Sequence, residues 1–316
     1  MDIALFYLPD VKYGGWPTYT AHLYYGLLEA GHNPQLFRIS KKSEKTNRNW
    51  GRGITYRNVN LYDAFDIAST NLSIITATTK DYDVETEALV KVGAKVIIHD
   101  PTELKGNIPA ILAECKDVIT IRPVNVGNLA KLGVESRYVP HPYARNPQPR
   151  SKKLLWAVSF SRVDWDKGTH FIVEANDNLS LSKRITIYGA ANRMYAHHKL
   201  PIHWEEYYRG TFPADNLWAG AQIASRYQWA VDMSTISGDG GGTQYTFLEA
   251  ADSGTALMLN EGWLTDRDDD ELKGYATFVN PEHLAEEITK KPTIYADALL
   301  EHHDARKLAI KTIGIE

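Results

Sequence analysis

Three short segments of the sequence combine glycines, cations and a carboxylate at spacings that suit a phosphorylated ligand. The first is Gly14-Gly15, which follows an apolar run and precedes a helical pattern. Glycines there let a ligand approach the backbone, and the start of a helix offers unpaired N–H groups to phosphate or hydroxyl oxygens. A simple tight turn would explain the same pair, which completes neither a G-x-G-x-x-G nor a Walker A motif.

The second segment, residues 161–168 (SRVDWDKG), follows another apolar run and precedes a helical pattern. Arg162 and Lys167 would then lie at the carboxyl end of a strand. Two cations at that position could hold a diphosphate and stabilise a leaving group. The alternative interpretation is a solvated loop.

The third segment, residues 238–250 (GDGGGTQYTFLEA), runs from glycines directly into a helical pattern. Backbone N–H groups at such a helix start suit a phosphate. Glu249, about one turn inside the helix, could accept hydrogen bonds from ribose hydroxyls. The alternative is a solvent-facing glutamate. The residues predicted to contact the phosphates are Gly240, Gly241, Gly242 and Thr243.

Strand and helix patterns alternate along the chain and predict α/β domains with parallel sheets. Glycines at 31 and 93 lie just past two predicted helices, as helix caps do. The predicted strands are residues 3–8, 35–39, 72–76, 95–99, 118–121, 154–159, 184–189, 229–233 and 255–259, and the predicted helices are 19–30, 84–92, 169–175 and 246–253.

The polar, proline-bearing stretch 144–153 separates two such series and is interpreted as a linker. We therefore expect a first domain over residues 1–146 and a second over 153–292. Residues 293–316 should form a helical tail, which could pack back on the first domain. Open α/β sheets bind ligands outside the carboxyl ends of their strands, so a cleft between the two domains is the expected site.

Composition excludes several classes of protein. The single cysteine, Cys115, rules out internal disulfides and a multi-thiolate metal site. No stretch approaches the roughly 18 apolar residues of a membrane span, and the start of the sequence lacks a signal-peptide pattern, so we expect a cytoplasmic protein. The acidic stretch 265–271 reads as a solvated loop, and no Asp-x-Asp pair follows a strand, so no metal cofactor is expected.

The segment 161–168, the Leu-Glu-Ala of residues 248–250 and Gly254-Thr255 together resemble the retaining GT-B glycosyltransferases of family 4. That family carries a second Glu eight residues before the Glu equivalent to Glu249, with seven residues between the two, whereas Gly241 stands at that position here. Residues 244–249 are similar to the DNA alpha-glucosyltransferases of T-even bacteriophages, which also lack that first acid.

The resemblance implies a GT-B fold, two Rossmann-like domains whose parallel sheets face across a cleft, and retaining transfer from a nucleotide sugar. It assigns His99 to the donor sugar and Asp100 to orienting that sugar or meeting the acceptor, with Arg162 and Lys167 completing the catalytic set. Gly14, Gly15 and Glu249 would bind the donor. A phage protein of this kind would act in the host cytoplasm.

An island of charge between residues 38 and 57 holds seven cations and a single acid, Glu44. Cations contact phosphates and aromatic rings stack on bases, so an anionic acceptor such as DNA with hydroxymethylated pyrimidines fits it. A solvated loop or a site for anionic glycans is the alternative. The predicted acceptor residues are Lys41, Lys42, Lys45, Arg48, Trp50 and Arg52.

Other functions remain compatible with the sequence. The acceptor could be a saccharide or a small molecule, and a sugar-nucleotide epimerase would use the same fold and donor. Because the first acid is missing, a catalytically silent sugar-nucleotide-binding protein is a third alternative. The net charge of −4 excludes only a globally cationic nucleic-acid binder.

Overall fold

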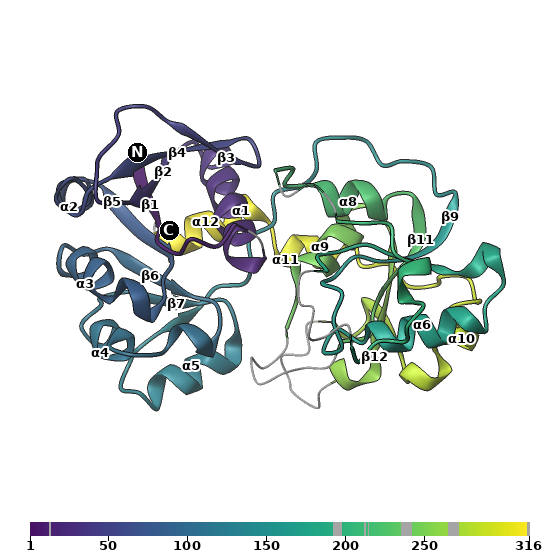
Figure 1. Ribbon diagram of the computed structural model, residues 1–316. Helices are drawn as coiled ribbons and strands as arrows, with labels where there is room; N and C mark the ends of the chain where they lie inside the picture. Colours follow the sequence, from purple (N-terminus) through teal and green to yellow (C-terminus); the bar gives the residue numbers. More distant parts are fainter. Residues whose placement is uncertain are drawn as a thin grey trace. The chain divides into compact units, whose positions relative to one another are not determined.

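Parallel strand pairing builds two separate sheets, shown in Figure 1. The computed structural model describes residues 1–12, 14–191, 198–211, 213, 215–234, 242–264 and 272–314. Its contacts divide the chain into two units. Unit 1 comprises Met1–Ala144, Ala214–Leu217 and His303–Glu316, and unit 2 comprises Arg145–Pro213 and Trp218–His302.

Unit 1 contains an eight-stranded sheet of order β3-β4-β2-β1-β5-β6-β7-β8. Every pair is parallel except β3 with β4. The carboxyl ends of the parallel strands therefore share one edge. The strands are β1 (Asp2–Tyr7), β2 (Asn33–Ile39), β3 (Arg48–Gly51), β4 (Ile54–Val59), β5 (Leu72–Ala77), β6 (Lys95–Ile98), β7 (Val118–Thr120) and β8 (Arg137–Tyr138).

Side chains alternate across β1, so the sheet of unit 1 has two apolar faces. Ala4, Phe6 and Leu8 join a core cluster with α2 (Leu61–Thr70), α3 (Asp83–Lys91), α4 (Ile108–Ala113) and α5 (Pro123–Ala130). The other face carries α1 (Gly15–Glu29) and α12 (Ala305–Ile313), as Figure 1 shows. Short 3₁₀ turns, η1 (Lys80–Tyr82) and η2 (Pro101–Glu103), follow β5 and β6.

Unit 2 contains a five-stranded sheet, parallel throughout, of order β10-β9-β11-β12-β13. Its first strand, β9, lies between β10 and β11, so the direction of the crossovers reverses there. The strands are β9 (Leu155–Ser159), β10 (Ile185–Ile187), β11 (Tyr227–Asp232), β12 (Ala256–Asn260) and β13 (Ala276–Val279).

Helices cover both faces of the second sheet. Residues of α6 (Thr169–Asp177) and α10 (Leu284–Glu287) share one core cluster with Trp229 and Met258. On the other side, α8 (Ala219–Ala224) and α9 (Tyr245–Asp252) pack against each other and against β11 and β12, and α11 (Leu299–His302) packs on α9. The remaining 3₁₀ turns are η3 (Leu181–Lys183), η4 (Trp204–Glu206), η5 (Glu261–Trp263) and η6 (Pro281–His283).

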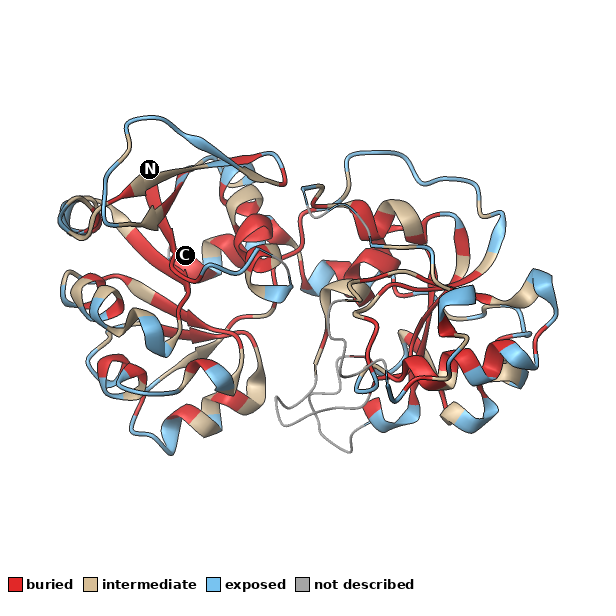
Figure 2. Cartoon of the chain, viewed as in Figure 1, coloured by how far each residue is buried: buried red, intermediate tan, exposed pale blue. Residues whose placement is uncertain are grey.

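The predicted strands and helices are confirmed to within a few residues, and the glycines at 31 and 93 have the positive φ of helix caps. Four strands were not predicted: β3, β4, β8 and β13. Figure 2 shows the sheets as largely buried and the connection between β2 and β3 as exposed. No helix in the described ranges is both long and apolar enough to cross a membrane.

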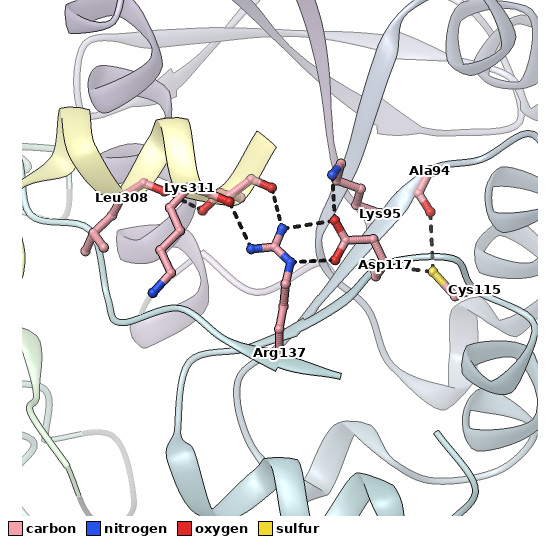
Figure 3. Close-up of polar contacts among 8 residues, drawn as sticks. Ala94, Lys95, Cys115, Asp117, Arg137, Leu308 and Lys311 are labelled. Carbon is pink, nitrogen blue, oxygen red and sulfur yellow. Dashed lines mark hydrogen bonds and ion pairs between the residues drawn. The ribbon is translucent and has the colours of Figure 1, made fainter. Parts of the chain in front are cut away.

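The C-terminal helix α12 packs on α1 in unit 1. Gly26 of α1 allows this close approach, because a Cβ there would lie 2.3 Å from the carbonyl oxygen of Ala305. Arg137 on β8 donates to the carbonyl oxygens of Lys311 and Thr312, each at 2.9 Å (Figure 3). Cations suit the last carbonyls of a helix, which carry its negative end.

The same guanidinium joins the helix to the sheet. Arg137 pairs with Asp117 through two nitrogens at 2.8 and 2.9 Å, and Lys95 at the start of β6 pairs with the same carboxylate (Figure 3). These two cations hold the pKa of Asp117 below its usual range, against the opposing effect of burial. One half-buried network therefore connects β6, β7, β8 and α12.

Substituting Arg137→Ala should lower the free energy of unfolding by about 1.5–3 kcal/mol, the range for hydrogen bonds to charged groups. Urea denaturation measures it. Arg306→Ala removes an exposed cation from α12 itself and should change stability by less than about 0.5 kcal/mol. Equal unfolding midpoints for Arg137→Ala and Arg306→Ala would contradict the role of the network.

Candidate functional site

Gly14 and Gly15 form the start of α1, close after β1. Gly14 has φ 97°, a conformation that favours glycine, and both glycines are exposed. A Cβ on either would meet nothing within 4 Å. No acidic side chain lies in the first turn of the helix. The positive end of α1 thus lies beside open space.

His99 follows β6 and is buried, with 4% of its surface exposed. Its Nε2 lies 2.7 Å from the carbonyl oxygen of Thr76. A carbonyl only accepts, so Nε2 carries the proton. Burial lowers the pKa of His99 to about 4, which keeps the ring neutral at pH 7. Nδ1 is then an acceptor, and it has no hydrogen-bond partner among the described residues.

Asp100 caps the 3₁₀ turn η2. Its Oδ1 accepts from the N–H of Thr102 at 2.8 Å and from the hydroxyl of the same residue. This is the capping-box arrangement, with Glu103 as the reciprocal partner. Asp100 therefore has a structural task at the position where the resemblance assigned it a role toward the sugar or the acceptor.

Glu103 is a buried residue that the sequence analysis missed. Its carboxylate accepts from the backbone N–H groups of His99 and Asp100, the latter at 3.0 Å. Burial raises the pKa of its carboxyl group well above the usual range. The available signal was the Asp-x-x-Glu spacing of residues 100–103, a helix-start pattern immediately after a strand. Glu103 holds the turn that presents His99.

In unit 2, Arg162 and Lys167 follow β9 but have different surroundings. Arg162 pairs with Asp164 at 3.1 Å and with Asp166 at 2.5 Å. Lys167 is half-buried and makes no ion pair with any residue that the structure describes. The charge of Arg162 is thus balanced by two acids of its own loop, whereas that of Lys167 is not.

The turn that presents Lys167 depends on Gly168. Its φ is 66°, and a Cβ there would lie 2.3 Å from the carbonyl oxygen of Met233, just after β11. The backbone N–H groups of Lys167 and Thr169 both point to the carbonyl oxygen of Asp164, at 3.3 Å. The loop is therefore a tightly folded turn, in which Trp165 and Asp166 are exposed.

Only part of the predicted glycine-rich loop can be placed. Gly240 and Gly241 lie outside the described residues, as does the acidic stretch 265–271. Gly242 and Thr243 precede α9, and Thr243 is buried, with 2% of its surface exposed. Within the described ranges, no three His, Cys, Asp or Glu side chains gather as metal ligands.

Glu249 lies in the second turn of α9 and is buried, with 7% of its surface exposed. The alternative of a solvent-facing glutamate is therefore wrong. Its carboxylate packs over Gly220 of α8, where a Cβ would lie 2.2 Å from Oε2. No described residue donates a hydrogen bond to it. Burial, and to a smaller extent Asp252, raise the pKa of Glu249 to about 8.

A small pocket opens at the carboxyl ends of β9 and β11. Ser161, Asp232 and Thr246 supply its polar lining. Oδ2 of Asp232 and Oγ1 of Thr246 are buried without a hydrogen-bond partner. This is where the strand order reverses, the usual ligand position in an open α/β sheet. Neither Asp232 nor Thr246 was among the predicted site residues.

The predicted acceptor residues of unit 1 fall into two groups. Lys41, Lys42 and Lys45 are exposed and make no ion pair with the described residues. Among the others, Arg48 is bound through two nitrogens to Glu44, at 2.6 Å each.

The other two predicted acceptor residues are largely covered. Trp50 packs edge-on against Tyr7, with ring centroids 5.4 Å apart. Arg52 is only 8% exposed, and it lies over Trp50 and donates to the carbonyl oxygen of Lys12. The ordered pair β3–β4 buries this part of the island, so its exposed charge comes mainly from the three lysines.

Comparison with known proteins gives structural matches only. No family model and no curated protein matches the sequence significantly. An alpha-glucosyltransferase in complex with UDP and a 13-mer DNA containing a HMU base aligns with TM-score 0.66 and 13% identity, covering 99% of this chain and 95% of that one. The pneumococcal O-GlcNAc transferase GtfA, in complex with UDP and GlcNAc, aligns with TM-score 0.67 and 10% identity, covering 99% and 98%.

A third match, Anabaena HepE in complex with UDP and glucose, has TM-score 0.61 and 11% identity, with 98% and 95% covered. Together with the two parallel sheets, these matches show that the chain has the GT-B fold of glycosyltransferases. The predicted fold class is confirmed.

Substituting Glu249→Gln should make the folded chain more stable at alkaline pH. An unfolded glutamate ionises near pH 4.5, but the folded one stays protonated up to about pH 8. The free energy of unfolding should therefore fall as the pH rises from 4.5 to 8. Glutamine removes this dependence, so the gain at pH 8 is up to about 4 kcal/mol.

Urea unfolding at pH 5 and pH 8 measures this effect. The exposed Glu301 of α11 provides the matched control, because Glu301→Gln should shift stability by less than about 0.5 kcal/mol at either pH. A pH dependence that Glu249→Gln leaves intact would show that another group causes it.

Proposed function

We propose that this chain is a retaining glycosyltransferase that moves a sugar from a nucleotide-sugar donor to an acceptor. The observation that carries the proposal is the buried carboxyl group of Glu249, which has no hydrogen-bond partner among the described residues. A buried polar group without a partner destabilises the fold by about 1–3 kcal/mol. A ligand with hydroxyl groups would satisfy it, as the two hydroxyls of a ribose do.

UDP is the nucleotide that best fits the comparisons, since the alpha-glucosyltransferase, GtfA and HepE structures each contain it. In this proposal the ribose meets Glu249 and the diphosphate lies at the start of α9. Lys167 then faces the diphosphate. Arg162, neutralised by Asp164 and Asp166, shapes the loop and contributes less charge.

The proposed reaction breaks the bond between the sugar carbon and the phosphate oxygen, and the nucleoside diphosphate departs with the electron pair. Its negative charge grows in the transition state, where Lys167 and the positive end of α9 stabilise it. The new glycosidic bond forms on the same face of the sugar, and the proton of the acceptor hydroxyl passes to an oxygen of the departing phosphate. His99 would contact the sugar through the unprotonated Nδ1.

The function is tested by incubating the protein with a panel of nucleotide sugars, with and without hydroxymethylated DNA. Released diphosphate and a gain in DNA mass are the two readouts. Release of diphosphate that needs no acceptor would indicate that the protein only hydrolyses the donor. Conversion of the donor sugar into another sugar would favour an epimerase. Absence of both binding and turnover for every donor would overturn the proposal.

Lys167→Ala should lower the rate of transfer by about 100-fold, as removal of one transition-state donor does. The exposed lysine at 291 in the same unit serves as the control, since Lys291→Ala removes an equal charge outside the loop of residues 161–168. Thermal unfolding should show both variants folded. Wild-type turnover in Lys167→Ala would reject the assignment of this loop.

For the acceptor we propose DNA carrying a hydroxymethylated pyrimidine. Three exposed lysines without ion pairs, at 41, 42 and 45, support an anionic partner for unit 1. The DNA bound to the similar alpha-glucosyltransferase adds weight. The net charge of −4 opposes DNA only weakly beyond a Debye length of about 8 Å at physiological salt.

If these lysines meet phosphates, binding should weaken steeply with salt, by about 0.9 in log–log slope for each contact. Replacing Lys41, Lys42 and Lys45 together by alanine should flatten the slope by up to about three units. A second triple variant, at the exposed Lys105, Lys116 and Lys131, removes the same charge elsewhere in unit 1 and should flatten it far less. If wild-type protein binds no DNA at low salt, a saccharide acceptor replaces this proposal.

A further inference from the structure

Trp16 is a half-exposed aromatic side chain beside His99 that neither the sequence motifs nor the proposed mechanism uses. It occupies the second position of α1, directly after Gly14-Gly15. Its ring centroid lies 6.3 Å from that of His99, and the ring planes are tilted by 50°. On the buried side, Tyr19 packs edge-on against the same imidazole at 4.8 Å.

One residue near the end of β5, Thr76, helps to position both Trp16 and His99. The hydroxyl of Thr20 lies 3.0 Å from the carbonyl oxygen of Trp16 and 2.9 Å from the hydroxyl of Thr76. Thr76 is fully buried and also accepts the Nε2 proton of His99. The first turn of α1 and the imidazole are therefore held by the same residue of β5, before any ligand binds.

The chemistry around these rings defines a ligand with three features. Nδ1 of His99 is an acceptor in a ring with only 4% of its surface exposed, so it requires a hydroxyl or amine donor. The negative face of an indole attracts C–H groups, which line one side of a sugar ring. The adjacent start of α1, with two glycines and no acid in its first turn, favours a phosphate.

We infer that Trp16 is the stacking platform for the sugar that is transferred, and that it holds the sugar against Nδ1 of His99. The inference rests on the proposed glycosyltransferase function and deepens it. A hydroxylated ring that carries a phosphate has all three features, whereas an acceptor pyrimidine in DNA has its phosphates further from the ring. The donor's glycosyl phosphate is thus the ligand chemistry that fits this corner of unit 1.

The test compares UDP-glucose with UDP, which lacks the sugar, by titration calorimetry. Trp16→Ala should weaken UDP-glucose binding by about threefold to tenfold, the value of one aromatic contact, and leave UDP binding unchanged. Trp16→Phe keeps a ring and should recover most of the affinity. Tyr24→Ala removes another half-exposed aromatic from α1, two turns away, and should change neither affinity.

Two outcomes would overturn the inference. In the first, Trp16→Ala weakens UDP and UDP-glucose equally, which would indicate a structural role. In the second, it leaves UDP-glucose binding and hydrolysis intact and raises only the KM for the DNA acceptor, which would place the base on Trp16. Failure of the proposed function looks different, because wild-type protein would then bind neither UDP nor UDP-glucose.

Discussion

Parallel strand pairing is the constraint on which the rest of this structure depends. In each unit the carboxyl ends of neighbouring parallel strands lie at one edge of the sheet, so residues that are distant in sequence come together there. Thr76 near the end of β5 and His99 after β6 meet in unit 1, and Ser161 after β9 and Asp232 at the end of β11 meet in unit 2. The crossover helices α1 and α9 then begin at the same edges with their positive ends toward it.

The fold could be predicted because apolar runs and glycine caps are local signals. β3 and β4 were missed because polar and charged residues dominate them, and they form strands only through the pairing of β4 with β2 and of β3 with β4. Residue types and spacing predicted which residues belong to the site, but not which of them form ion pairs with one another. Nothing local in the sequence distinguishes Arg162, bound to two acids, from Lys167, or predicts that Glu249 is buried against Gly220.

Several polar atoms of the candidate site residues are buried without a hydrogen-bond partner, which lowers the stability of the fold. Oδ2 of Asp232 and Oγ1 of Thr246 are buried without a hydrogen-bond partner. Glu249 is buried and no described residue donates to its carboxyl group, and His99 of unit 1 retains an unused acceptor. Replacing any one of these groups by an apolar residue of similar shape would stabilise the folded protein. Polar groups of this kind are typical of a site shaped for a ligand at the expense of stability.

The position of α12 has a consequence for the order in which the chain is made. Unit 2 is nearly continuous in sequence, whereas unit 1 receives its last helix from residues 303–316. During synthesis the N-terminal half emerges first, yet the face of α1 around Gly26 stays uncovered until α12 has been made. Domains usually complete themselves from the N-terminus onward. Here unit 1 begins to be synthesised first, but it is the last unit that can complete its fold.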